Sequence, residues 1–308
     1  MRLGVSLAQA GRMADPASIR AAATAAEQVG YSSVWVSDHR PGPGWGPAPE
    51  GREPDAGPLA GLATTLDPMS VLTYAAAVTT RVRLGTSVLV APWYRPVLLA
   101  RSLTSLDVLS DGRLTVGLGL GWSLDEFDAV GVPQEELGRR LDDALDMLAT
   151  VWGTGGPAAG GRDAAGSPIP TAPGTVPRPR PPVLLAAYTP EGLDRVARRA
   201  DGWNPAGLPI EMLAPLWASV RDLAAGHGRD PDALELVVRA NLVISDRPID
   251  GERTSYAGTV EQVAADIADT RRAGAHEVIL GLSGDHDLDQ ALDAYARIAE
   301  AVDITAMA

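Results

Sequence analysis

Residues 33–40 read SVWVSDHR, an apolar run that stops on three polar side chains. Its first half is β-branched and aromatic, as strands prefer, and a continuous apolar run is typical of a strand buried on both faces. Ser37, Asp38 and His39 follow at the carboxyl end of this run. The stretch therefore predicts a parallel α/β fold with polar groups at the strand ends.

Similar runs recur along the chain and are separated by segments with helical spacing of apolar residues. The predicted strands are Leu3–Leu7, Ser33–Ser37, Val82–Val90, Leu114–Gly119, Val183–Ala187, Asp201–Asn204, Leu236–Ile244 and Glu277–Leu282. The clearest helical segments are Ser18–Val29, Leu137–Trp152 and Val260–Arg272. Gly30 is a predicted C-cap of the first, and Thr259 with Gln262 forms a capping-box pattern before the third.

Strict alternation of strand and helix implies a parallel sheet. Eight such repeats in 308 residues predict a single domain over residues 1–308, folded as a (β/α)8 TIM barrel. An open doubly wound sheet is the alternative architecture.

Two segments rich in Gly and Pro, residues 40–66 and 153–181, exceed what a minimal barrel needs. The first follows a strand and so lies on the carboxyl-terminal face, where barrel active sites occur. The second follows a helix and is long enough to fold over the barrel. Both are predicted insertion loops, and the sequence leaves open whether they act as lids or only as flexible connections.

Composition excludes several classes of function. The net charge of −13 argues against a nucleic-acid partner, and no apolar run approaches the roughly 20 residues that span a bilayer. There is no cysteine, and all 26 basic residues are arginine, which excludes thiolate and Schiff-base chemistry. We therefore expect a cytoplasmic protein whose partner is a small molecule.

Asp38 and His39 are the first candidates for chemistry, because they end a predicted barrel strand. Imidazole titrates near pH 6.5 and can exchange protons at neutral pH, and Asp38 could orient it or bond a ligand. The alternative is that Asp38 caps a turn beside an exposed His39. His227, His276 and His286 are weaker candidates, and no two histidines have metal-ligand spacing, so we expect no metal site.

Two further motifs have both a functional and a structural explanation. Gly117, Gly119 and Gly121 do not form a dinucleotide fingerprint, but they would let a flat ligand approach the strand end or allow tight packing. Thr189 and Pro190 form a typical helix start, whose free amides suit a phosphate although most helices need such a cap anyway.

Four segments together resemble the bacterial luciferase-like family, and within it the coenzyme F420-dependent oxidoreductases of actinobacteria. They are AAEQVGYSSVWVSDH, RVRLGTSVLVAP, RPVLLARSLTSLDVLSDGRLTVGLGLGWSLDEFDAVGVP and ARRADGWNP. The resemblance covers most of residues 1–205 and is looser in the last third. It implies a (β/α)8 barrel whose mouth holds the deazaflavin F420 or, in other branches, FMN.

The resemblance also implies cofactor-binding residues. The ring would lie against GTSVLVAP, where family members have a cis peptide bond, here Ser87–Val88, with Gly119 beside it. Asp38 matches a polar residue of the family next to the ring. The cofactor phosphate would sit at the helix start formed by three residues: Tyr188, Thr189 and Gly192.

The implied reaction is hydride transfer between F420 and a small organic substrate, such as reduction of a C=C or C=N bond. His39 would supply or remove the proton, and Asp38 would bond the ring or hold His39. The alternative is an FMN-dependent monooxygenase that receives reduced flavin from a flavin reductase. A third possibility is a non-catalytic barrel, and family members are often homodimers.

One position departs from the family's sugar-phosphate dehydrogenases. Their catalytic Glu aligns with Trp122, and the lysines that bind their substrate phosphate have no counterpart here. A sugar phosphate is therefore not the expected substrate. Trp45 and Trp122 instead suggest an apolar or planar substrate near the ring, although either could be a core residue.

Overall fold

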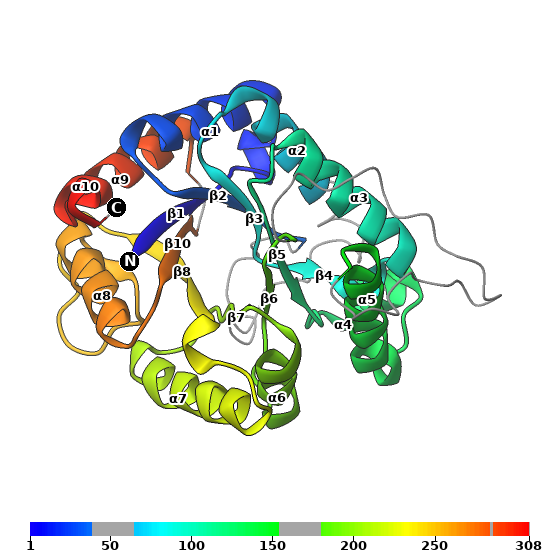
Figure 1. The fold of residues 1–308 in the computed structure, drawn as a ribbon. Helices are drawn as coiled ribbons and strands as arrows, with labels where there is room; N and C mark the ends of the chain where they lie inside the picture. The colour runs from blue at the N-terminus through cyan, green and yellow to red at the C-terminus, as the bar shows by residue number, and fades with distance from the viewer. Residues whose placement is uncertain (39–64, 154–179, 284–285, 308) are drawn as a thin grey trace.

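The computed structural model describes residues 1–38, 65–153, 180–283 and 286–307. Within them, eight parallel strands form a closed barrel. They are β1 (Arg2–Ser6), β2 (Ser33–Val36), β3 (Arg83–Thr86), β5 (Leu114–Gly119), β6 (Val183–Leu185), β7 (Gly202–Trp203), β8 (Glu235–Ile244) and β10 (Glu277–Leu282). Strand β10 pairs with both β1 and β8, which closes the sheet (Figure 1) and excludes the open arrangement. The predicted TIM barrel is confirmed.

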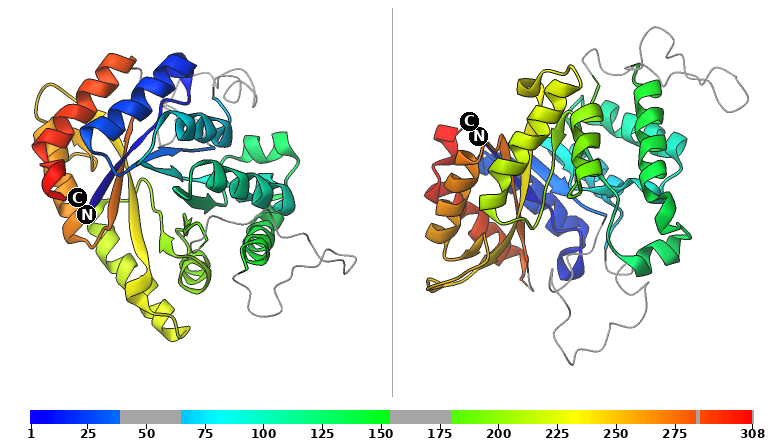
Figure 2. Two further views of the ribbon diagram at one scale, coloured as in Figure 1. Left: turned by 45° about the horizontal axis from the view of Figure 1, so that its top comes forward. Right: turned by 90° about the horizontal axis from the view of Figure 1, so that it is seen from below.

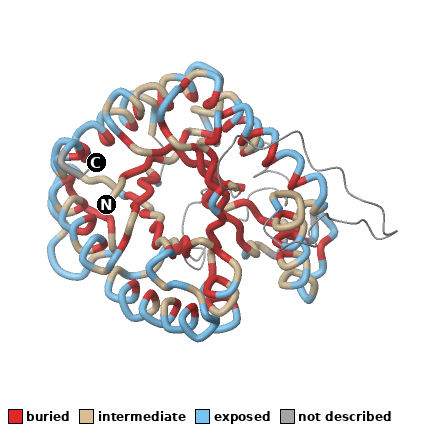
Figure 3. The backbone as a smooth tube through the Cα atoms, viewed as in Figure 1, coloured by how far each residue is buried: buried red, intermediate tan, exposed pale blue. Residues whose placement is uncertain are grey.

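Helices surround the strands on the outside (Figures 1 and 2). They are α1 (Pro16–Val29), α2 (Pro68–Val78), α3 (Pro96–Leu109), α4 (Leu124–Val130), α5 (Leu137–Val151), α6 (Pro190–Arg199), α7 (Ile210–Gly226), α8 (Val260–Arg272), α9 (Leu288–Ala301) and α10 (Ile304–Met307). Short 3-10 turns occur at Gly11–Met13, Ala91–Trp93, Gln134–Glu136 and Pro231–Ala233. Buried residues follow the strands and the inner sides of the helices, while the outer sides are exposed (Figure 3). The main core therefore lies between barrel and helices.

The predicted caps are confirmed. Gly30 ends α1 with a φ of 104°, and Thr259 and Gln262 form a complete capping box at α8. Helix α1 begins two residues earlier than predicted, because Asp15 accepts hydrogen bonds from the first turn and Pro16 occupies its first position.

Two differences concern strands. The predicted strand Val82–Val90 is divided into β3 and β4 (Leu89–Val90), and the peptide bond Ser87–Val88 between them is cis. Strand β9 (Ala257–Gly258) pairs with β8 and was not predicted, since two residues carry no periodicity. The predicted loops 40–66 and 153–181 lie almost wholly outside the described residues, so a lid role stays a prediction.

The amino-terminal half of the barrel interior is filled. The buried side chain of Trp35 packs with Leu184, Val237 and Ile279 as an inner cluster. Glycines make room for it: a Cβ added to Gly85 would lie 2.2 Å from a ring carbon of Trp35. Only a small residue at that position leaves the indole in place.

An ionic layer lies at the amino-terminal ends of the strands, next to Trp35. Glu277 is fully buried and pairs with Arg2 at 3.1 Å and with Arg83, while Ser33 donates a hydrogen bond to it. Ser33 in turn accepts a hydrogen bond of 2.7 Å from the indole N–H of Trp35. Since this end of the barrel is occupied by protein groups, a ligand can enter the barrel only at the carboxyl ends of the strands.

Gly85→Ala should lower the free energy of unfolding by about 1–3 kcal/mol, because the added methyl overlaps the Trp35 ring in a close-packed interior. Urea unfolding followed by circular dichroism measures it. Gly138→Ala in α5 is the matched control: its Cβ would meet nothing closer than 3.6 Å, and the change should be neutral or stabilising. Equal effects of the two substitutions would contradict the packing described here.

Candidate active site

A cavity of about 580 Å³ opens at the carboxyl ends of the barrel strands. Residues at or just beyond the ends of β1, β2, β3, β5, β6, β7, β8 and β10 contribute to its wall. Its size is in the range that binds cofactors and drug-sized molecules, and its position is that of active sites in this fold. A cavity therefore lies where the sequence predicts the site, and its use as an active site stays a prediction.

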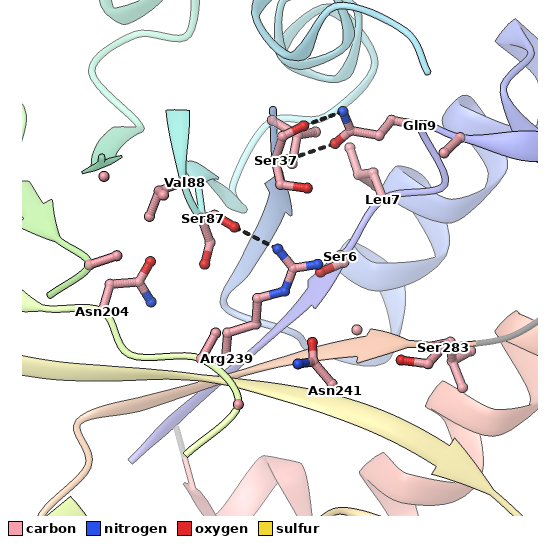
Figure 4. A pocket seen from close by; sticks show the side chains of 18 of the residues that line it. Ser6, Leu7, Gln9, Ser37, Ser87, Val88, Asn204, Arg239, Asn241 and Ser283 are labelled. Atoms are coloured by element: carbon pink, nitrogen blue, oxygen red, sulfur yellow. Dashed lines mark hydrogen bonds between the residues drawn. The ribbon is translucent and has the colours of Figure 1, made fainter. Parts of the chain in front are cut away.

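The segment between β3 and β4 forms one wall (Figure 4). Ser87 and Val88, joined by the cis bond expected from the family resemblance, both line the cavity. The Ser87 N–H donates to the carbonyl of Val36 at 2.7 Å, and the Asp38 N–H donates to the carbonyl of Val88 at 3.2 Å. This wall is thus held by the backbone of the β2 end.

The glycines of β5 pack against the same segment. A Cβ on Gly117 would lie 2.0 Å from the Thr86 carbonyl oxygen, and one on Gly119 would lie 2.7 Å from a Val88 methyl group. Gly119 and Gly121 also line the cavity, whereas Gly117 does not. Packing therefore accounts for Gly117, and Gly119 serves packing while leaving its face of the cavity open.

Asp38 supports this wall from behind and does not line the cavity. Its buried carboxylate accepts hydrogen bonds from the Val90 N–H at 2.7 Å and from the Tyr94 hydroxyl at 2.9 Å. Burial, and then the charge of Asp38, raise the pKa of Tyr94, which stays a neutral donor. The predicted contact of Asp38 with a cofactor ring stays a prediction, and His39 lies outside the described residues.

Gln9, which was not among the predicted site residues, holds the end of β2 in place. Its amide donates to the Ser37 carbonyl at 2.6 Å and accepts from the Ser37 N–H at 2.7 Å. The side chain of Gln9 therefore forms the hydrogen bonds that a neighbouring strand would otherwise form with the backbone at the end of β2. Both residues line the cavity.

Arg239 projects from β8 across the mouth of the barrel toward Ser87 (Figure 4). Its Nη1 donates to the Ser87 carbonyl at 2.6 Å, and its buried Nε has no hydrogen-bond partner among the described residues. Burial lowers the pKa of Arg239, an effect that Tyr188 and Tyr295 partly offset. Arg239 was not among the predicted site residues, although a cation within the apolar run ELVVRANLVI marks it in the sequence.

Asn204, just after β7, is the second polar residue of the wall with an unsatisfied atom. Its amide donates to the Val237 carbonyl at 2.7 Å, while its buried Oδ1 accepts no hydrogen bond from the part of the chain that the structure describes. Buried polar atoms without partners are uncommon in native proteins and suggest a missing ligand. The edge of a flavin or deazaflavin ring alternates carbonyl and N–H groups, so an unpaired donor on Arg239 and an unpaired acceptor on Asn204 fit such a ring.

The start of α6 lies on the cavity wall as predicted, with Tyr188, Thr189 and Gly192 all lining it. Thr189 caps the helix by accepting from the Gly192 N–H at 3.1 Å. Arg195, one turn further on, also lines the cavity and forms two hydrogen bonds to Asp142 at 2.9 and 3.1 Å. Phosphate binding here stays a prediction.

Of the remaining candidates, one tryptophan and one histidine line the cavity. Trp122 lines the cavity with 62 % of its surface exposed, so it is not a core residue, and Trp45 lies outside the described residues. His286, which we had ranked among the weaker histidines, also lines the cavity. His276 accepts a hydrogen bond from the Leu236 N–H near the opposite end of the barrel, and His227 pairs with Asp194.

Two kinds of feature are absent from the described residues: a metal-binding cluster and a membrane-spanning helix. No group of three or more His, Cys, Asp or Glu side chains there could hold a metal ion. No helix in that part of the chain is both long and apolar enough to cross a membrane.

The chain belongs to the luciferase-like monooxygenase family, whose model matches residues 1–254. The family predicted from the sequence is therefore confirmed. An uncharacterized protein of Mycobacterium tuberculosis is 34 % identical over 247 residues, which are 78 % of this chain and 84 % of the relative.

Two further comparisons are with a dehydrogenase and with a monooxygenase. An F420-dependent glucose-6-phosphate dehydrogenase of Kineococcus radiotolerans is 34 % identical over 142 residues, 44 % of this chain and 37 % of that protein. The solved structure of a monooxygenase from Streptomyces bottropensis superimposes with a TM-score of 0.77 over 100 % of both chains, at 23 % identity. At that identity the second likeness concerns the fold alone.

Asp38→Ala should lower the free energy of unfolding by about 1–3 kcal/mol even without ligand, because it leaves the buried Val90 N–H without its acceptor. Tyr94→Phe removes one neutral donor only and should cost about 1 kcal/mol. Urea unfolding of both variants tests this. An Asp38→Ala protein of wild-type stability would show that the carboxylate does not support the wall.

Proposed function

We propose that the protein is an F420-dependent oxidoreductase that transfers a hydride between the deazaflavin and a small organic substrate. The observation that carries the proposal is the cavity wall at Ser87–Val88, faced by a half-buried arginine that no carboxylate of the described residues neutralises. The F420-dependent relative from Kineococcus radiotolerans supports this cofactor. Reduction of a C=C or C=N bond is the reaction we favour.

In this proposal, Ser87, Val88 and Gly119 bind the ring face, because they line the cavity side by side at the strand ends and Gly119 has no side chain to obstruct a ring. The amide of Asn204 and the guanidinium of Arg239 orient the polar edge of the ring. When bound, a deazaflavin supplies a ring carbon that accepts or donates a hydride.

Other residues would serve the phosphate, the substrate and the proton. Tyr188, Thr189 and Gly192 receive the cofactor phosphate at the positive end of the α6 dipole. An apolar or planar substrate would stack on the exposed indole of Trp122, with Trp45 as its predicted partner. Two further residues would act in concert: His39 as the proton donor or acceptor and Asp38 as a support of the neighbouring wall.

The second candidate function is an FMN-dependent monooxygenase that depends on a flavin reductase. The match to the family of luciferase-like monooxygenases and the fold shared with the Streptomyces monooxygenase favour it. The residues assigned to ring and phosphate are the same in both functions, since both cofactors have a tricyclic ring and a phosphate. The two candidates differ in the cofactor that binds.

Titration of the purified protein with F420 and with FMN, each followed by fluorescence, tests the proposal. We expect F420 to bind at least tenfold more tightly than FMN. A preference for FMN would replace the proposal by the monooxygenase. Binding of neither cofactor would favour a non-catalytic barrel and contradict both.

His39→Ala should reduce turnover with bound cofactor by about 10²–10⁴-fold, the usual contribution of general acid–base catalysis. Cofactor affinity should change little, because the imidazole acts on the substrate. Stopped-flow measurement of hydride transfer tests the role, with His227→Ala as a control on the outer surface. Unchanged turnover of His39→Ala would remove the residue from the mechanism.

A further inference from the structure

Arg239 lines the cavity and, unlike four other partly buried arginines of the described chain, has no carboxylate as its partner. Arg113 likewise donates to neutral oxygens, but it does not line the cavity. Arg2 and Arg83 share Glu277, Arg195 binds Asp142, and Arg253 binds Asp266 through two hydrogen bonds of 2.6 Å. Arg239 donates only to the neutral carbonyl of Ser87, and the titratable groups that influence it are tyrosines. No acidic side chain of the described residues therefore balances its charge.

A cation without an acidic partner stays solvated as long as water fills the cavity around it. A planar ligand that covers Ser87 and Val88 displaces that water, and the charge then loses much of its solvation. The loss is smallest when the ligand itself carries negative charge next to the guanidinium, since attraction between charges grows as the dielectric constant falls. The geometry thus favours a ligand that is, or becomes, an anion.

Transfer of a hydride supplies such a charge. A hydride consists of one proton and two electrons, so the ring that accepts it gains one negative charge and the donor loses one. Charged groups near the ring are among the means by which proteins tune a redox cofactor. A fixed guanidinium next to the ring therefore stabilises the reduced ring more than the oxidised ring.

We infer that Arg239 binds the reduced ring more tightly than the oxidised ring and so raises the reduction potential of the bound cofactor. The inference rests on the proposed function only in requiring that a flavin or deazaflavin ring binds at Ser87–Val88. It holds for F420 and FMN alike. It assigns to Arg239 a role in the reaction that is separate from proton transfer by His39.

The test measures dissociation constants of oxidised and reduced cofactor for the wild type and for variants, together with the midpoint potential of the bound cofactor. F420 and FMN are both used. Arg239→Gln keeps a hydrogen-bond donor but removes the charge. We expect the reduced cofactor to bind at least tenfold more weakly relative to the oxidised one, which corresponds to a potential about 30 mV lower for a two-electron couple.

Further variants separate charge from structure. Arg239→Lys retains the charge and should keep most of the wild-type ratio. Asn241→Asp places a carboxylate two residues along β8 on the same face, in the same cavity, and should shift the ratio in the direction of Arg239→Gln without removing the arginine. Arg221→Gln removes a cation of the outer surface and should leave the ratio unchanged.

The outcomes are distinguishable. Equal weakening of oxidised and reduced cofactor by Arg239→Gln, or an unchanged ratio in both Arg239→Gln and Asn241→Asp, would overturn the inference while leaving the proposed function intact. Failure of the wild type to bind either cofactor would overturn the proposed function, and the inference with it. If Arg239→Gln does not fold, Asn241→Asp and Arg239→Lys still decide the question.

Discussion

The Trp35 side chain at the centre of the barrel is the constraint on which the site depends. A barrel of eight strands has an interior only wide enough for side chains, and one indole together with the ionic layer around Glu277 fills its amino-terminal half. Gly4 and Gly85 are small because this indole lies against them. The cavity can then open only at the carboxyl ends of the strands, where every barrel strand contributes to its wall.

The partly buried arginines at the two ends of the barrel differ in whether a carboxylate pairs with them. At the closed end, Glu277 neutralises Arg2 and Arg83 within the protein. At the open end, Arg239 is held in place by a backbone carbonyl and is left without an acidic partner in the described chain. The charge of Arg239 therefore remains available to a ligand in the cavity, and the proposed redox chemistry depends on it.

Local patterns in the sequence were sufficient for the architecture. Caps such as Gly30 and Thr259 act over a few residues, and the alternation of strand and helix defined the barrel. The strand that contains Trp35 could be predicted, but the side to which its indole points could not. Both faces of this strand are apolar, so the sequence does not show which face lines the barrel interior and which packs against the helices.

The wall of the site was only partly predictable, since it is built by contacts between distant residues. Arg239 meets Ser87 across 152 positions, and Gln9 meets Ser37 across 28. Neither contact leaves a periodic pattern in the sequence. The segment Ser87–Val88 and the start of α6 were predicted because the family resemblance pointed to them.

A crystal structure with bound F420 or FMN would test the central claim most directly, because it measures where the ring lies relative to Arg239. The account predicts a ring against Ser87–Val88 with the guanidinium within about 3–4 Å of its polar edge, a hydrogen-bonding or ion-pair distance. A ring bound elsewhere in the cavity, or a guanidinium turned away from it toward solvent, would contradict the account.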